Sequence, residues 1–125
     1  MHADHTLLEI AAHLMIAAFF IVIGIRNIPR SDQHIEKFRD LGIPFPAALL
    51  ISGFATQFTG ALSLALDVYP VIGAIMLLVY VVLALVLYHQ YWRMTDPFLR
   101  ITHQNYFWNN VGGMGGLLLV IQVNL

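Results

Sequence analysis

The feature that most constrains this chain is the length of its uncharged apolar stretches. Four stretches contain no Lys, Arg, Asp or Glu, and they cover residues 10–25, 41–66, 68–88 and 104–125. A hydrocarbon core about 30 Å thick is crossed by roughly 20 apolar residues of helix. The sequence therefore predicts an all-α, integral membrane four-helix bundle in a single domain, 1–125, with a short interfacial amphipathic helix between helices one and two. The expected transmembrane helices cover residues 6–27, 46–66, 70–92 and 104–124, and the interfacial helix covers 31–41.

Composition agrees with a membrane protein and excludes several classes of function. Hydrophobic residues make up 59% of the chain and charged residues 10%, whereas soluble domains average about 45–50% and about 25%. The net charge is −1, so a nucleic-acid partner is not expected. Cysteine is absent, which excludes disulfides and thiolate metal sites, and no metal site is expected.

Local signals place the ends of the helices. Thr6, followed by Glu9 three residues later, has the pattern of a helix N-cap, and Ser31 is interpreted as a second cap. Pro46 and Pro70 suit the first turns of the second and third transmembrane helices. Residues 94–102 are expected to form a loop. No positively charged region precedes the first apolar stretch, so we expect the first helix to be retained.

All six basic residues lie in two segments, which follow the first and third transmembrane helices. They are Arg26, Arg30, Lys37 and Arg39, and Arg93 and Arg100. The positive-inside rule makes these two loops cytoplasmic and places both chain termini on the outer side. The expected location is the cell's inner (plasma) membrane, with the lipid bilayer as the first partner.

Glu9 and His13 are the ionisable pair within the first helix. They are four residues apart and so lie on one helix face, where a carboxylate can orient an imidazole. One interpretation is a proton relay. The other, which this spacing favours, is that Glu9 lies at the outer interface while His13 bonds to a neighbouring helix as a packing contact.

Gln57 lies between Gly53 and Gly60 on one face of the second helix. Small residues permit close helix packing, and the amide of Gln57 can then bond to a partner helix or to a quinone oxygen. Gly112 and Gly116 have the GxxxG spacing, which favours a close crossing within the bundle or between subunits.

Histidine, arginine and aromatic residues gather around the second basic loop. The cluster includes His89, Trp92, Arg100, His103 and Trp108. Hydrogen-bond donors within an aromatic pocket at a membrane boundary suit a quinone headgroup, although interfacial anchoring accounts for the same residues. Nothing in the spacing of His13, His89 and His103 selects a pair of axial ligands, so haem is not expected.

The order of these features resembles the DoxX family of small four-helix membrane proteins, from about Gly24 to Leu119. The segments that carry the resemblance are Lys37-Phe38, Leu41-Gly42-Ile43-Pro44-Phe45-Pro46, the stretch from Gly53 to Gly60, His89-Gln90-Tyr91-Trp92, Asp96-Pro97, Phe107-Trp108-Asn109-Asn110 and Gly115-Gly116-Leu117-Leu118. Two positions depart from the family's pattern. Gln57 stands where the family often has a glutamate, and Asn109-Asn110 stands where it usually has Lys-Asn.

The resemblance implies a membrane redox context, because the family takes its name from a membrane subunit of a thiosulfate:quinone oxidoreductase. The expected function is a membrane subunit of a quinone-linked redox complex, with Gln57, His89, Trp92, Arg100, His103 and Trp108 near the quinone and with Glu9 and His13 as a proton relay. Other redox subunits, and a second copy of the chain, are expected partners. The alternative is a non-catalytic anchor or assembly scaffold, and a transporter ranks last because the spans lack midplane charge.

Overall fold

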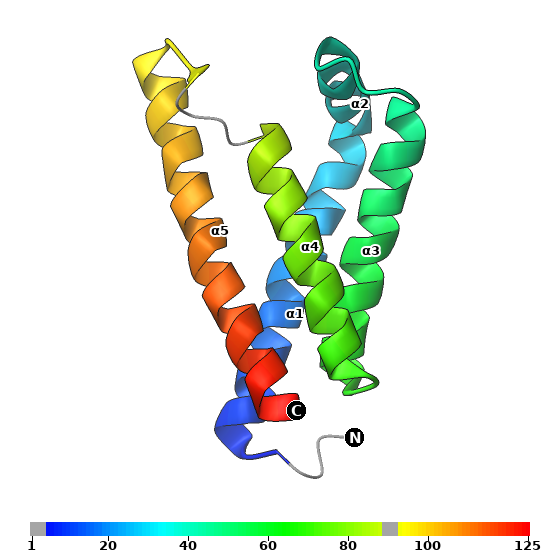
Figure 1. Ribbon diagram of the computed structural model, residues 1–125, viewed down its shortest axis with the longest axis vertical. Helices are drawn as coiled ribbons and strands as arrows, with labels where there is room; N and C mark the ends of the chain where they lie inside the picture. Colours follow the sequence, from blue (N-terminus) through cyan, green and yellow to red (C-terminus); the bar gives the residue numbers. More distant parts are fainter. Residues whose placement is uncertain (1–4, 89–92) are drawn as a thin grey trace.

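The computed structural model describes residues 5–88 and 93–125. Its elements are α1 (Leu7–Asn27), the 3-10 helix η1 (Ile28–Arg30), α2 (Ser31–Asp40), α3 (Pro46–Leu66), α4 (Pro70–Tyr88) and α5 (Pro97–Asn124). The four long helices form one bundle, with α1 behind α4 and between α3 and α5 (Figure 1). The predicted all-α membrane bundle is confirmed.

Three helical stretches in the described part of the chain are long and apolar enough to cross a membrane. They are Leu7–Asp40, which continues from α1 into α2, then Pro46–Leu66 and Pro70–Leu87. Many large apolar side chains are exposed on these helices, for example Met15 at 71% and Ile51 at 68%. Such a surface is suited to lipid tails rather than to water. The fourth span that we predicted from the sequence, α5, is more polar but has 28 residues, or roughly 42 Å of helix.

The N-terminal ends of the helices follow the signals in the sequence, with two exceptions. The hydroxyl of Thr6 accepts a hydrogen bond from the amide of Glu9, so the predicted cap of α1 is confirmed. Ser31 is not the N-cap of α2, because its own backbone angles are helical, Arg30 takes the N-cap position, and the Ser31 hydroxyl donates to the carbonyl of Ile28.

The last helix begins earlier than predicted. We expected a loop over 94–102, but α5 starts at Pro97. The carboxylate of Asp96 accepts hydrogen bonds from the amides of Phe98 and Leu99, and proline fits the first helical position. The dipeptide Asp96-Pro97 was therefore a helix start signal, and residues 98–102 belong to the helix. For the third span, predicted over 70–92, α4 reaches Tyr88, and residues 89–92 lie outside the described residues.

The α3–α4 hairpin is packed most closely, at two glycines. A Cβ atom on Gly73 would lie 2.5 Å from the Cβ of Ser63, and one on Gly60 would lie 3.0 Å from the carbonyl oxygen of Gly73. The two backbones thus approach each other directly, as small residues allow in membranes. By contrast, a Cβ atom on Gly112, Gly113 or Gly115 of α5 would meet no described atom within 4 Å.

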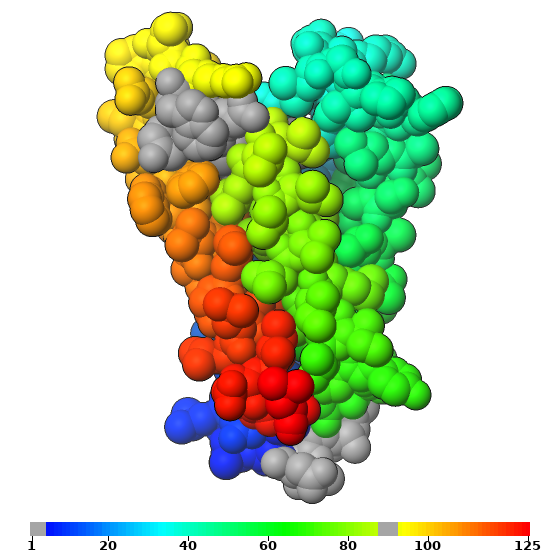
Figure 2. All heavy atoms as spheres, viewed as in Figure 1, coloured from blue at the N-terminus to red at the C-terminus, as the bar shows by residue number. Residues whose placement is uncertain are grey.

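The buried core runs along the bundle axis. Its members are Ala17 and Phe20 of α1, Ala61 and Leu64 of α3, Ala74, Leu77, Val81 and Leu85 of α4, and Leu117 and Val120 of α5. The interfacial helix α2 is attached to the bundle by Phe38, which is 4% exposed. The space-filling view shows α4 and α5 side by side, with a notch at one end between the start of α5 and the α2–α3 side (Figure 2).

The two ends of the bundle differ in charge. Both termini and the α3–α4 turn lie at one end, and α2 and the start of α5 lie at the other (Figure 1). All six Lys and Arg residues belong to segments at the second end, from Arg26 to Arg39 and from Arg93 to Arg100. The end with the termini carries carboxylates and histidines instead.

Candidate functional sites

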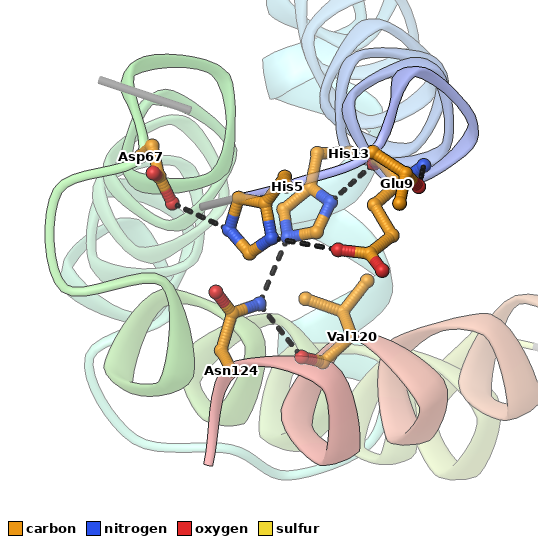
Figure 3. Close-up of polar contacts among 7 residues, drawn as sticks. His5, Glu9, His13, Asp67, Val120 and Asn124 are labelled. Carbon is orange, nitrogen blue, oxygen red and sulfur yellow. Dashed lines mark hydrogen bonds and ion pairs between the residues drawn. The ribbon is translucent and has the colours of Figure 1, made fainter. Parts of the chain in front are cut away.

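A polar network joins three separate segments at the end of the bundle that holds the termini (Figure 3). His5 precedes α1, Glu9 and His13 lie on its first turns, Asp67 is the C-cap of α3, and Asn124 ends α5. Sequence reasoning identified Glu9 and His13 but missed the other three. Their contacts join residues as much as 111 positions apart, and no local spacing signals such a contact.

His5 bridges two carboxylates. Its Nδ1 atom lies 2.8 Å from Oε2 of Glu9, and its Nε2 atom lies 3.4 Å from Oδ1 of Asp67. A ring with both nitrogens facing carboxylate oxygens is best satisfied when both carry protons. The hydrogen bond to Glu9 raises the pKa of His5, with further contributions from Asp67, while burial acts in the opposite direction.

His13 is held differently, because it is 1% exposed and bonds to a backbone carbonyl and a side-chain amide. Its Nδ1 atom faces the backbone carbonyl of Glu9, which can only accept a hydrogen bond, so Nδ1 carries the proton. The amide nitrogen of Asn124 lies 2.9 Å from Nε2 and also donates to the carbonyl of Val120. Both amide protons are therefore used, and Nε2 is the acceptor. The expected pairing of His13 with the Glu9 carboxylate is replaced by a bond to the Glu9 backbone.

Gln57 lies in the α1–α3 interface and is 0% exposed. Its Nε2 atom donates to the carbonyl of Phe20 at 2.7 Å, which is the cross-helix hydrogen bond proposed from the sequence. Gly24 makes room for this contact, because a Cβ there would lie 3.1 Å from the same nitrogen. The other amide atom, Oε1, is buried and has no hydrogen-bond partner among the described residues.

A groove between α1 and α5 is open to the side of the bundle. It has a volume of about 250 Å³ and is lined by Met15, Ile16, Phe19, Phe20, Asn109 and Gly113. Its walls are apolar and aromatic except for Asn109, which lies near the middle of α5. Within residues 5–88 and 93–125, the amide of Asn109 has no hydrogen-bonding partner. The sequence singled out Asn109 only as a departure from a family pattern.

The other residues predicted to hold a quinone are spread along α5 and beyond. Arg100 is exposed, His103 is half-buried with its ring edge-on to Tyr106, and Trp108 is 57% exposed. Their helix lies against α4, whereas Gln57 bonds to α1. His89 and Trp92 lie outside the described residues. In the described parts of the chain, no group of three or more His, Asp or Glu residues is arranged to hold a metal ion.

The long apolar helices and the lipid-suited surface are those of a multi-pass helical membrane protein embedded in a bilayer. The model of the DoxX family matches residues 10–90, which is more than half of the chain. The chain therefore belongs to the DoxX family.

One curated relative extends the similarity over nearly the whole chain. The protein is 25% identical over 118 residues to the inner membrane protein YphA of Escherichia coli (strain K12), and the alignment covers 94% of this chain and 84% of the relative. No solved structure matches the chain.

Proposed function

We propose that this chain is the membrane subunit of a quinone-linked redox complex and that the α1–α5 groove receives the quinone headgroup. The observation that carries the proposal is the placement of Asn109 in an apolar, aromatic groove that is open to the side. A polar amide in the hydrocarbon region costs free energy unless it is paired. A quinone carbonyl can accept the hydrogen bond that the amide offers.

The lining of the groove suits the rest of a quinone. Phe19, which is 47% exposed, offers an aromatic surface to a flat ring, and no described atom lies within 4 Å of a Cβ placed on Gly113. A groove open to the bilayer lets an isoprenoid tail remain among the lipid tails. Gln57 then acts as a positioning residue, because it holds the carbonyl of Phe20 in place.

Reduction of a bound quinone needs two electrons and two protons. Histidine is the only strong transition-metal ligand in this Cys-free chain, so we assign the electron source to a redox centre on a partner subunit. In this proposal His103 and Arg100, about 9 Å and about 14 Å along α5 from Asn109, face the aqueous side from which protons enter. His89, Trp92 and Trp108 stay proposed members of the quinone site, and Glu9 and His13 stay a proposed proton relay at the other end of the bundle.

The orientation follows from charge. We assign the end that bears Lys and Arg to the cytoplasm and the termini to the outer side, by the positive-inside rule. The membrane is assigned as the bacterial inner membrane, with support from the similarity to an inner membrane protein of Escherichia coli. The domain is assigned as one unit over 1–125, since all four helices share one core.

Quinone binding is tested with the full chain in lipid nanodiscs, with decylubiquinone as the probe and quenching of tryptophan fluorescence as the readout. Loss of one neutral hydrogen bond in Asn109→Leu is expected to weaken binding by about 2–12-fold, corresponding to roughly 0.5–1.5 kcal/mol. Asn110→Leu is the matched control, because the amide of Asn110 donates to the carbonyl of Tyr106 on its own helix. Quenching that does not saturate, or equal effects of the two variants, would contradict the proposal.

The second candidate is an anchor or scaffold for a larger complex. The observation that favours it is the open space beside Gly112 and Gly115 on the exposed side of α5, where another transmembrane helix can pack closely. Purification in mild detergent distinguishes the two functions. A stable complex from which no quinone can be extracted supports the scaffold, whereas co-purified quinone supports the redox subunit.

A further inference from the structure

We infer that His5 is a pH-sensitive clasp, whose protonated ring ties the start of α1 to the α3–α4 turn and whose deprotonation opens a path for water to His13. The clasp operates whether or not a quinone binds, so it goes beyond the proposed function. It rests on the geometry of five side chains at the end of the bundle with the termini (Figure 3).

The first step is the connection between chain segments. His5 contacts Glu9 on α1 and Asp67 in the turn between α3 and α4. The contact with Asp67 is the longer of the two, 3.4 Å against 2.8 Å. A neutral imidazole has one N–H donor, so it can keep only one of these bonds. The other nitrogen then points a lone pair at a carboxylate, and the longer contact is the one that is lost.

The second step is what the clasp covers. A surface pocket of about 430 Å³ is lined by His5, Asp67, Pro70, Val123, Asn124 and Leu125. The ring of His5 lies over that of His13, with ring centres 4.9 Å apart, and Asn124 bonds to Nε2 of His13. His5 and Asn124 thus form two walls of the pocket and also cover His13. Movement of His5 away from Asp67 removes one of these walls.

The third step is the electrostatic setting. The ionisable groups that face His5 in the described residues are the carboxylates of Glu9 and Asp67 and the ring of His13. No Lys or Arg belongs to the segments at this end of the bundle. The protonated ring of His5 supplies the positive charge between the two carboxylates. Deprotonation of the ring leaves those carboxylates facing one another without that charge.

The sign of the pH effect follows from the pKa. Because the pKa of His5 is raised in the folded protein, the clasp is closed below the ordinary histidine value near 6.5. It is released as pH rises through the higher folded value. The end of the bundle with the termini therefore closes in acid and opens as the pH rises.

The test uses hydrogen–deuterium exchange at the imidazole C2 position, read residue by residue by mass spectrometry on the full chain in nanodiscs. This exchange reports both the pKa of a histidine and its access to water. At pH 9, His13 is expected to exchange several-fold more slowly in His5→Lys, whose permanent charge keeps the clasp closed, than in the unmodified chain. In His5→Gln, His13 is expected to exchange several-fold faster than in the unmodified chain at pH 5.5, where the clasp of the unmodified chain is closed.

His34→Gln is the control, because His34 lies on α2 at the opposite end of the bundle. It should leave the exchange of His13 unchanged. A His5 pKa at or below the ordinary value overturns the inference, as does equal exchange of His13 in the three versions of residue 5. No quinone enters the measurement, so its failure leaves the quinone proposal to be judged on its own binding data.

Discussion

The closest approach in the bundle makes a quantitative prediction about Gly73. Replacing Gly73 with Ala places a Cβ 2.5 Å from Ser63 Cβ and 3.2 Å from its hydroxyl oxygen. Overpacking of this kind costs about 1–3 kcal/mol. Alanine also favours the helix over glycine by roughly 1 kcal/mol, so the effect of the clash must be separated from that gain.

Gly112→Ala supplies the matched comparison, because it makes the same chemical change in α5, where no atom of the described residues lies within 4 Å of the new Cβ. The propensity gain is common to both variants. We therefore expect the free energy of unfolding of Gly73→Ala to lie about 1–3 kcal/mol below that of Gly112→Ala. The measurement is reversible unfolding in mixed detergent micelles with increasing SDS, followed by circular dichroism.

A double variant identifies the clashing atom. Ser63→Gly removes the nearest neighbour of the new methyl group and should recover part of the loss in Gly73→Ala, with a coupling of about 0.5–3 kcal/mol. The carbonyl of Gly60, 3.0 Å away, limits the recovery. If Gly73→Ala and Gly112→Ala unfold within about 0.5 kcal/mol of each other, the helices are not in direct backbone contact at this point and the reasoning fails.

Three further predictions use other contacts. Asp96→Ala removes the N-cap of α5 and should cost about 1 kcal/mol, with faster amide exchange at Phe98 and Leu99; unchanged exchange there would contradict the cap. Gln57→Glu should lower the free energy of unfolding more than Gln57→Leu. A carboxylate cannot donate to the carbonyl of Phe20 and stays buried, whereas leucine also removes the oxygen that has no partner among the described residues. The reverse order of the two variants would refute this account. The free energy of unfolding of the unmodified chain should decrease as pH rises above about 6.5 through the raised pKa of His5. His5→Gln should lose that decrease. An identical pH profile for the two chains would exclude His5 as the cause of the decrease.

The sequence was sufficient for most helix boundaries because these depend on neighbours along the chain. Thr6 caps α1, and Pro46 and Pro70 begin α3 and α4. The start of α5 was missed although Asp96-Pro97 is an equally local signal. The polar residues within 98–105 lower the local hydropathy, so hydropathy alone places the start of the span later.

The candidate sites were predicted less completely, because they depend on contacts between distant segments. The spacing of Glu9 and His13 correctly placed them near one another, but the partners are Asp67 and Asn124 from two other helices, together with His5. Similarly, the glycine pattern at Gly112 and Gly116 predicted a close crossing within the bundle or between subunits, whereas the close crossing of α3 and α4 occurs at Gly60, on the face that the sequence predicted to pack closely, and at Gly73. A spacing motif identifies a face of a helix and leaves open which helix, if any, packs against it.

The geometry of α5 connects the groove with the network at the termini. Near its C-terminal end, α5 meets α1 through Asn124, which bonds to His13, and through Gly116, where a Cβ would lie 3.5 Å from Ile16. Towards Asn109 the same two helices leave the open groove, and the start of α5 lies apart from α2 and α3 (Figure 1). The space between α1 and α5 is thus narrow where the polar network holds the two helices and wide where the amide of Asn109 is exposed. Because Asn124 and Gly116 connect α5 to α1 at this end and α5 also packs against α4, we expect a change in the network to alter the width of the groove without unpacking the α3–α4 hairpin.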